Sequence, residues 1–161
     1  MKIMSIDPGY DRVGIAILEK SDETNYKEKL IYSDCLTTSS KDTFTKRLKS
    51  IGLDIEKIIK KYKPTVMVIE SLFFNSNQKT VMLVSEAKGM IKYVALYNKL
   101  DIFEYTPLQI KIAVTGYGRS DKQQVTIMTK NLIEIDKEIK YDDEYDAIAV
   151  GLTYFAINPV K

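Results

Sequence analysis

The chain has 161 residues, 45% hydrophobic and 29% charged, which is enough for one domain with a buried core and a polar surface. Its formal net charge is only +2, so nucleic-acid binding would have to rely on local basic patches rather than on bulk charge. It has no histidine and one cysteine, Cys35, which excludes serine–histidine triads, cysteine–histidine dyads, internal disulfides and zinc sites that need imidazole.

The first half of the chain alternates between strand and helix signals. Residues 2–7, 12–19 and 26–37 are short apolar stretches separated by turn residues, and they predict three strands joined as hairpins. Apolar residues then recur at helical spacing between Ser39 and Pro64, with Ser39 or Ser40 as the expected N-cap and the proline after the helix. Residues 65–70 form a continuous apolar run, which is typical of a strand buried on both faces.

The second half is mainly helical. Residues 77–98 predict a helix with an apolar arc so wide that two of its sides should be covered, either within one core or by a second copy of the chain. Residues 101–106 predict a fifth strand, and residues 107–115, 121–134 and 141–156 predict three helices. No repeat, linker, signal peptide or membrane-spanning run interrupts this order, so we expect a single cytoplasmic domain over residues 1–161.

Two of the predicted strands end in a carboxylate. Asp7 closes the first strand, just before Pro8-Gly9, and Glu70 closes the fourth. If the fourth strand returns parallel to the first through a right-handed crossover, the two carboxylates become neighbours. Open α/β sheets place their functional sites at this carboxyl edge. The sequence therefore predicts an α/β fold with an acidic site at one end of the sheet.

The last predicted helix adds further acidic residues. Asp143 and Asp146 are three residues apart and share a face of its first turn. Acidic residues are common at helix N-termini for capping alone, but Asp146 directly precedes the buried apolar stripe. Carboxylates gathered in one pocket repel each other unless a cation lies between them, and Mg²⁺ or Mn²⁺ prefers oxygen ligands. Two such ions about 3.5–4 Å apart can hydrolyse a phosphodiester.

Five motifs in one order resemble those of the RuvC family of Holliday junction resolvases: IDPG, VIESLFFNSN, EAKG, YTPLQIKIAVTGYGRSDKQQV and DDEYDAIAV. The resemblance implies a ribonuclease-H-like fold, with a five-stranded mixed sheet and helices on both faces. It implies a homodimer that nicks opposed strands of four-way DNA junctions and leaves 5′-phosphate and 3′-hydroxyl ends. It also implies Mg²⁺, replaceable by Mn²⁺, with two ions per active site. The implied catalytic and metal-binding residues are Asp7, Glu70, Asp143 and Asp146.

The resemblance also implies DNA contacts. Phe73 matches an aromatic residue inserted near the junction centre, and Lys111 and Lys122 match basic residues near the active site. Exposed aromatics such as Phe73 and Phe74 can stack on base steps, although either could instead pack in the core. Arg119 joins the two lysines in a glycine-jointed basic patch suited to phosphates, although single surface lysines are usually only solvated.

Other readings remain open. A related ribonuclease-H-fold nuclease could act on RNA, and a junction-binding protein without cleavage would keep the basic loop but would not need four carboxylates. Sugar-kinase-like or actin-like ATPases also begin with a strand ending in Asp, but they need two such domains. A branch-migration motor is a further expected partner. Ser85 and the Glu144-Tyr145 pair depart from the usual family pattern, which indicates a divergent branch such as a phage-encoded one.

Overall fold

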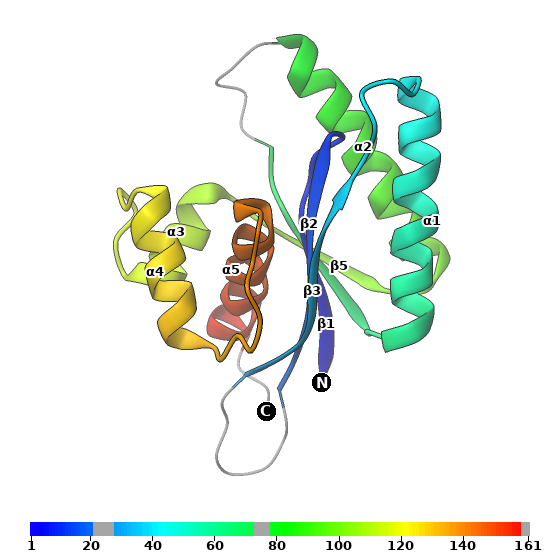
Figure 1. Cartoon of the computed structure of the whole chain (residues 1–161). Coiled ribbons are helices and arrows are strands. Elements are labelled where there is room, and N and C mark those ends of the chain that lie inside the picture. The colour runs from blue at the N-terminus through cyan, green and yellow to red at the C-terminus, as the bar shows by residue number, and fades with distance from the viewer. Residues whose placement is uncertain (21–27, 73–77, 159–161) are drawn as a thin grey trace.

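The computed structural model of the chain describes residues 1–20, 28–72 and 78–158. A mixed sheet stands between two layers of helices (Figure 1). The strands are β1 (Lys2–Asp7), β2 (Arg12–Glu19), β3 (Lys29–Thr37), β4 (Val66–Glu70) and β5 (Asp101–Tyr105). The helices are α1 (Phe44–Tyr62), α2 (Gln78–Tyr97), α3 (Pro107–Thr115), α4 (Lys122–Leu132) and α5 (Asp142–Ile157).

The strand order is β3-β2-β1-β4-β5. β2 pairs antiparallel with both β1 and β3, whereas β4 lies parallel to β1 and β5 lies parallel to β4. The predicted return of the fourth strand beside the first is therefore confirmed. Because Ile6 pairs with Ile69, the next residues of these two strands, Asp7 and Glu70, come out at the same edge of the sheet.

Alternation along the strands assigns each side chain to one face. Met4 and Ile6 of β1 pack in the core that α1 and α2 cover, whereas Ile3 packs in the core that α5 covers. Asp7 continues the odd-numbered series and faces α5. Glu70 does the same, since Val66 and Val68 of β4 also pack toward α5. The alternation of side chains along β1 and β4 thus places both Asp7 and Glu70 on the face covered by α5.

Helix α5 packs very closely on the sheet because glycines lie at both contact points. A methyl group at Gly14 of β2 would lie 1.9 Å from the backbone oxygen of Asp143. One at Gly151 of α5 would lie 2.6 Å from Leu18 Cδ1 and 2.8 Å from Ser5 Oγ. At Gly14 the obstacle is backbone, so a side chain there would require the helix to move, whereas at Gly151 the side chains of Leu18 and Ser5 would have to shift. Gly14 therefore fixes how near the acidic first turn of α5 comes to β2.

The predicted α/β fold class and all ten predicted elements within the described residues are confirmed, but the expected cap of the first helix is wrong. Helix α1 begins at Phe44, with Thr43 in the N-cap position. Ser39 instead forms a turn, in which its backbone oxygen accepts from Asp42 N at 3.1 Å and its hydroxyl accepts from Lys41 N at 3.2 Å. The first residues of the predicted third strand, 26 and 27, lie outside the described residues.

None of the described helices is both long enough and apolar enough to cross a bilayer.

Candidate active site

The two strand-end carboxylates are largely buried and lie near other carboxylates. Burial raises the pKa of Asp7 well above its ordinary value, and repulsion from Glu70, Asp146 and Asp143 raises it further. Burial also raises the pKa of Glu70 to about 7, and Asp146 adds to the shift. The four predicted catalytic carboxylates therefore act on each other electrostatically, as expected for a site that binds a cation.

A lysine of α4 forms ion pairs with the first turns of α5. Lys122, the first residue of α4, places its Nζ 2.8 Å from Asp146 Oδ2 and 2.6 Å from Asp142 Oδ2. Burial lowers the pKa of Lys122, but its two carboxylate partners outweigh this effect and raise it. Burial also raises the pKa of Asp146, which Lys122 offsets only in part. The N-termini of α4 and α5 and the carboxyl ends of β1 and β4 lie at the same end of the molecule (Figure 1).

Two residues of this arrangement were missed by the sequence analysis. Asp142 shares Lys122 with Asp146, and its i, i+4 spacing from Asp146 could have indicated a common face. Arg12, which follows the β1–β2 turn, lies with its Nε 3.2 Å from Asp143 Oδ2 and its guanidinium over the ring of Tyr141. This contact lacks hydrogen-bond geometry, so the buried Oδ2 of Asp143 has no hydrogen-bond donor in the described part of the chain.

A cavity of about 190 Å³ opens beside these carboxylates. Glu70 and Asp146 line it together with both predicted DNA-binding lysines, Lys111 of α3 and Lys122. Its remaining wall is formed by Pro107, Ile110, Val125 and Ala149. Two acidic and two basic side chains thus converge on one hollow with an apolar wall, which suits an anionic group that is held between a cation site and lysines.

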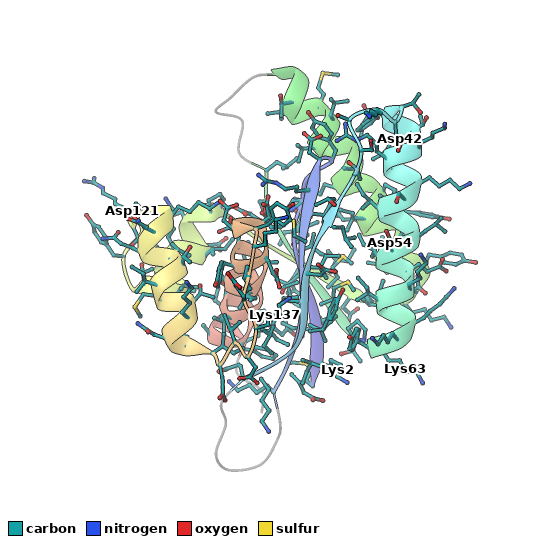
Figure 2. All side chains as sticks on the ribbon, in the orientation of Figure 1. Lys2, Asp42, Asp54, Lys63, Asp121 and Lys137 are labelled. Atoms are coloured by element: carbon teal, nitrogen blue, oxygen red, sulfur yellow. The ribbon has the colours of Figure 1, made fainter. Side chains whose placement is uncertain are left out.

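The other predicted DNA-binding residues are not part of this cavity. Arg119 is exposed in the loop between α3 and α4. That loop leads to Asp121, which caps α4 by accepting a hydrogen bond from Gln124 N at 2.8 Å and stands at the outer end of the helix (Figure 2). Phe73 and Phe74 lie outside the described residues.

The chemistry of the donor set fits a hard divalent cation. The four carboxylates offer only oxygen ligands, and the pKa values of Asp7, Glu70 and Asp146 are raised. One oxygen of Asp143 has no hydrogen-bond donor among the described residues. Among the described residues, however, no three acidic or cysteine side chains are gathered closely enough to hold an ion as they stand. Asp146 forms an ion pair with Lys122, and Asp143 forms one with Arg12. To bind a metal ion, each of these carboxylates would have to give up its basic partner.

A buried lysine, Lys88, also acts on Glu70. Lys88, from the EAKG motif in α2, is only 8% exposed and donates to Glu104 of β5 at 2.6 Å, where Lys92 forms a second ion pair. The charge of Lys88 also lowers the pKa of Glu70, against the larger effect of burial. The motif was recognised in the sequence, but the partner of Lys88 was not, because Glu104 is on another element.

Helix α2 has a buried apolar side and an exposed apolar side. Ala87, Ile91 and Ala95 are fully buried, and Ile91 and Ala95 pack in the core beneath α1 and α2. The opposite side nevertheless exposes large apolar side chains: Met82, Tyr93, Leu96 and Tyr97. Burial within one core therefore accounts for the predicted arc, and the exposed side chains form a second apolar side that the prediction did not include.

Comparisons with known proteins agree with this geometry. The family model described as crossover junction endodeoxyribonuclease RuvC matches residues 3–154. A protein of that name from Natranaerobius thermophilus is 42% identical over 96% of this chain and 94% of its own length, and one from Finegoldia magna is 43% identical over 96% and 92%. The structure of Thermus thermophilus RuvC is similar with a TM-score of 0.86 and 22% identity, covering 97% of this chain and 94% of that one. This likeness confirms the predicted ribonuclease-H-like fold.

Another solved structure holds DNA. The Thermus thermophilus RuvC in complex with a Holliday junction substrate superposes with a TM-score of 0.85 at 21% identity, over 97% of this chain and 94% of that chain. The yeast mitochondrial Holliday junction resolvase is more distant, with a TM-score of 0.70 and 11% identity over 96% of this chain and 77% of that chain.

Proposed function

The chain belongs to the RuvC family of crossover junction endodeoxyribonucleases, and from this membership and its acidic site we propose that it is a metal-dependent endonuclease resolving four-way DNA junctions. The observation that carries the proposal is the convergence of Asp7, Glu70, Asp143 and Asp146 at one end of the sheet, next to a cavity lined by two lysines. A protein that only bound junctions would not need four mutually repelling carboxylates.

These four carboxylates would hold Mg²⁺, or Mn²⁺ in its place, with two ions per site. When bound, the ions would polarise the scissile phosphate and activate a water for in-line attack. Attack of the water opposite the 3′ oxygen would form a new P–O bond and break the P–O3′ bond, so that the 3′ oxygen leaves and takes up a proton. The products are a 5′-phosphate and a 3′-hydroxyl. The donor set supports this assignment, since every ligand atom is a carboxylate oxygen.

The lysines of the cavity would hold the DNA backbone. Lys111 and Lys122 line the same hollow as Glu70 and Asp146, so a phosphate there would lie between carboxylates and ammonium groups. Lys122 already uses two hydrogen bonds on Asp142 and Asp146, and a metal ion that takes over Asp146 would release one of them for a phosphate oxygen. The side chain of Lys122 thus exchanges an internal partner for the substrate.

The selection of branched DNA would depend on residues farther from the cavity. Arg119 is exposed on the neighbouring loop and would add a phosphate contact. Phe73 and Phe74 follow Glu70 closely in sequence, so an aromatic side chain there would reach unstacked bases near the branch point.

Resolution requires two nicks, and a homodimer would supply two sites. The outer face of α2 supports this, because Met82, Tyr93 and Leu96 share one side of the helix and stay exposed in a single copy. Sedimentation of the protein with and without a junction tests the dimer, and monomers in both conditions would exclude paired nicking. A branch-migration motor would be a transient partner of this dimer on DNA.

The decisive experiment compares a synthetic mobile four-way junction with duplex and three-way controls in Mg²⁺. We expect nicks near the branch of the four-way junction. Asp7→Asn should reduce the cleavage rate by roughly 1,000-fold or more, the scale seen when one member of a catalytic unit is removed. Junction binding should persist, since the lysines are unchanged. Cleavage by Asp7→Asn at the wild-type rate would refute the site.

A further inference from the structure

An arginine from the far side of the sheet holds the turn that follows Asp7. Arg47 belongs to α1, on the face opposite α5, yet its guanidinium reaches the β1–β2 turn. Its Nε donates to Thr38 Oγ1 at 2.8 Å, and its Nη2 donates to the backbone oxygen of Tyr10 at 3.1 Å. The same Nη2 forms an ion pair with Asp11, and the guanidinium stacks on the ring of Tyr10, 4.8 Å from its centroid.

The guanidinium of Arg47 is a buried, hydrogen-bonded part of the turn and not a solvated surface charge. The side chain of Arg47 is only 10% exposed. Burying a guanidinium is costly unless its N–H groups find acceptors, and here the acceptors come from three residues of two different segments. The planar fork of arginine spreads its donors over separate nitrogens at fixed angles, so that Nε and Nη2 reach different acceptors, whereas all donors of lysine leave from one nitrogen.

Thr38 completes the clamp. Its hydroxyl donates to Tyr10 O at 2.6 Å, and its backbone N–H donates to Asp11 O at 3.0 Å. The end of β3, the start of α1 and the β1–β2 turn are thus joined through one hydroxyl and one guanidinium. Because Arg47 lies at the start of α1 and contacts Tyr10 and Asp11, a shift of α1 would displace the β1–β2 turn.

The clamped turn carries an active-site residue at each end. Asp7 precedes it, and Arg12, the partner of Asp143, follows it. The turn is tight, since a methyl group at Gly9 would lie 2.0 Å from the backbone oxygen of Arg12. A displacement at Tyr10 or Asp11 would therefore move both ends, and with them the spacing between Asp7 and the acidic turn of α5.

We propose that Arg47 is a positioning residue of the nuclease: by holding the β1–β2 turn from behind the sheet, it sets the placement of Asp7 and Arg12 relative to Asp143. The proposal rests on the proposed function, because it assigns Arg47 a role in that same site. Arg47 does not contact the reacting atoms. Its effect should appear in the chemical step and in the metal requirement, not in the affinity for DNA.

The test compares Arg47→Lys, which keeps the charge but loses the fork, with Ile55→Val. Ile55 is a fully buried residue of α1 that packs in the core and makes none of the turn contacts. Single-turnover cleavage of a four-way junction at saturating protein should fall about 10- to 100-fold in Arg47→Lys, the scale of a small misplacement of catalytic groups. The Mg²⁺ concentration for half-maximal rate should rise, and the junction dissociation constant should stay within about twofold, since the DNA-contacting lysines are unchanged. Ile55→Val should change none of these values.

A second pair of variants tests the hydroxyl of Thr38, which accepts from Arg47 and donates to the backbone oxygen of Tyr10. Thr38→Ser keeps the hydroxyl that accepts from Arg47 and should retain the rate, whereas Thr38→Val removes it and should lower the rate. Amide hydrogen exchange at Thr38, whose N–H donates to Asp11, provides a readout that does not depend on cleavage. It should speed up in Arg47→Lys but not in Ile55→Val.

The outcomes separate the two proposals. If the wild-type chain fails to cut any junction, the proposed function fails, and the exchange at Thr38 still tests whether Arg47 holds the turn. If the wild type cuts and Arg47→Lys cuts equally fast at the same Mg²⁺ requirement, the positioning role is overturned. Equal losses in Arg47→Lys and Ile55→Val would also overturn it, because they would reflect stability alone.

Discussion

The two faces of the sheet are covered by helices that pack in different ways. Under α1 and α2 the core consists mainly of isoleucines, which fill the space between helix and sheet with bulky side chains. Under α5 the core also holds larger side chains such as Leu18 and Val68, but Gly14, Ala16 and Gly151 lie among them, and at Gly14 the backbone of the helix comes directly against the strand. This face also buries polar side chains, including Ser5 and Thr153.

We call the side of the sheet under α1 and α2 the supporting face, because it contributes packing, and the side under α5 the chemical face, because it carries the acidic site. Bulky residues on the α1 face hold the strands at a fixed spacing and can absorb a small change in volume. Small residues on the α5 face let the acidic turn of α5 approach Asp7, so that a single methyl group would alter the site. One strand serves both purposes, because alternate residues of β2 point to opposite faces.

The largest effect should come from placing a methyl group on the close-packed face. Gly14→Ala should push the backbone of Asp143 away from β2, since the added carbon would lie 1.9 Å from its oxygen. We expect the free energy of unfolding to fall by about 1–3 kcal/mol. Single-turnover junction cleavage should fall about 100-fold, because Asp143 and Asp146 shift together. Gly89→Ala is a matched control, since a methyl group there meets nothing within 4 Å. Wild-type cleavage by Gly14→Ala would show that close approach of α5 is not required.

An effect of intermediate size should come from the ionisation of Glu70, which lies on the same face of the sheet as Gly14. The pKa of Glu70 is raised from 4.5 to about 7, so ionising this group costs the folded state more than the unfolded state. Its contribution to stability is complete below about pH 4.5 and is lost as the pH rises to about 7. In Mg²⁺-free buffer the free energy of unfolding should therefore decrease across this window, by at most about 3 kcal/mol from this group.

Glu70→Gln tests this origin of the pH dependence, because it keeps the shape of the side chain but cannot ionise. Its unfolding free energy in urea should change less between pH 4.5 and 7 than that of the wild type. Added Mg²⁺ should flatten the wild-type profile as well, since a bound cation favours the ionised carboxylates. An identical slope in the wild type and in Glu70→Gln would show that the charge of Glu70 does not strain the fold.

The sequence shows more of the chemical face than of the contacts that organise it. Asp7 and Glu70 are readable because each ends an apolar run, and Asp143 and Asp146 because helical spacing puts them on one side. The pairings of Arg12 with Asp143 and of Lys122 with Asp142 are not readable, because each joins two elements whose relative placement depends on packing. No local periodicity carries that information.

The start of α1 shows the same limit on the supporting face. Ser39 and Ser40 are good N-cap residues, so local propensity predicts an earlier helix start than the observed Phe44. The contacts of Arg47 with the β1–β2 turn accompany the later start and place this arginine in the first helical turn. Tertiary contacts outweigh the local capping preference here, and this is why the clamp could not be foreseen from the sequence.

The smallest effect should come from the supporting face, one residue along the same strand. Ile15 follows Gly14 in β2 and is fully buried beneath α1 and α2. Ile15→Val removes one methylene and should lower the free energy of unfolding by about 0.5–1.5 kcal/mol. Junction cleavage by the folded protein should stay at the wild-type rate, since nothing on the α5 face is moved. Urea unfolding and single-turnover cleavage check the two expectations. A loss of cleavage comparable to that of Gly14→Ala would mean that the sheet transmits packing changes from one face to the other, and the separation of support from chemistry would then be wrong.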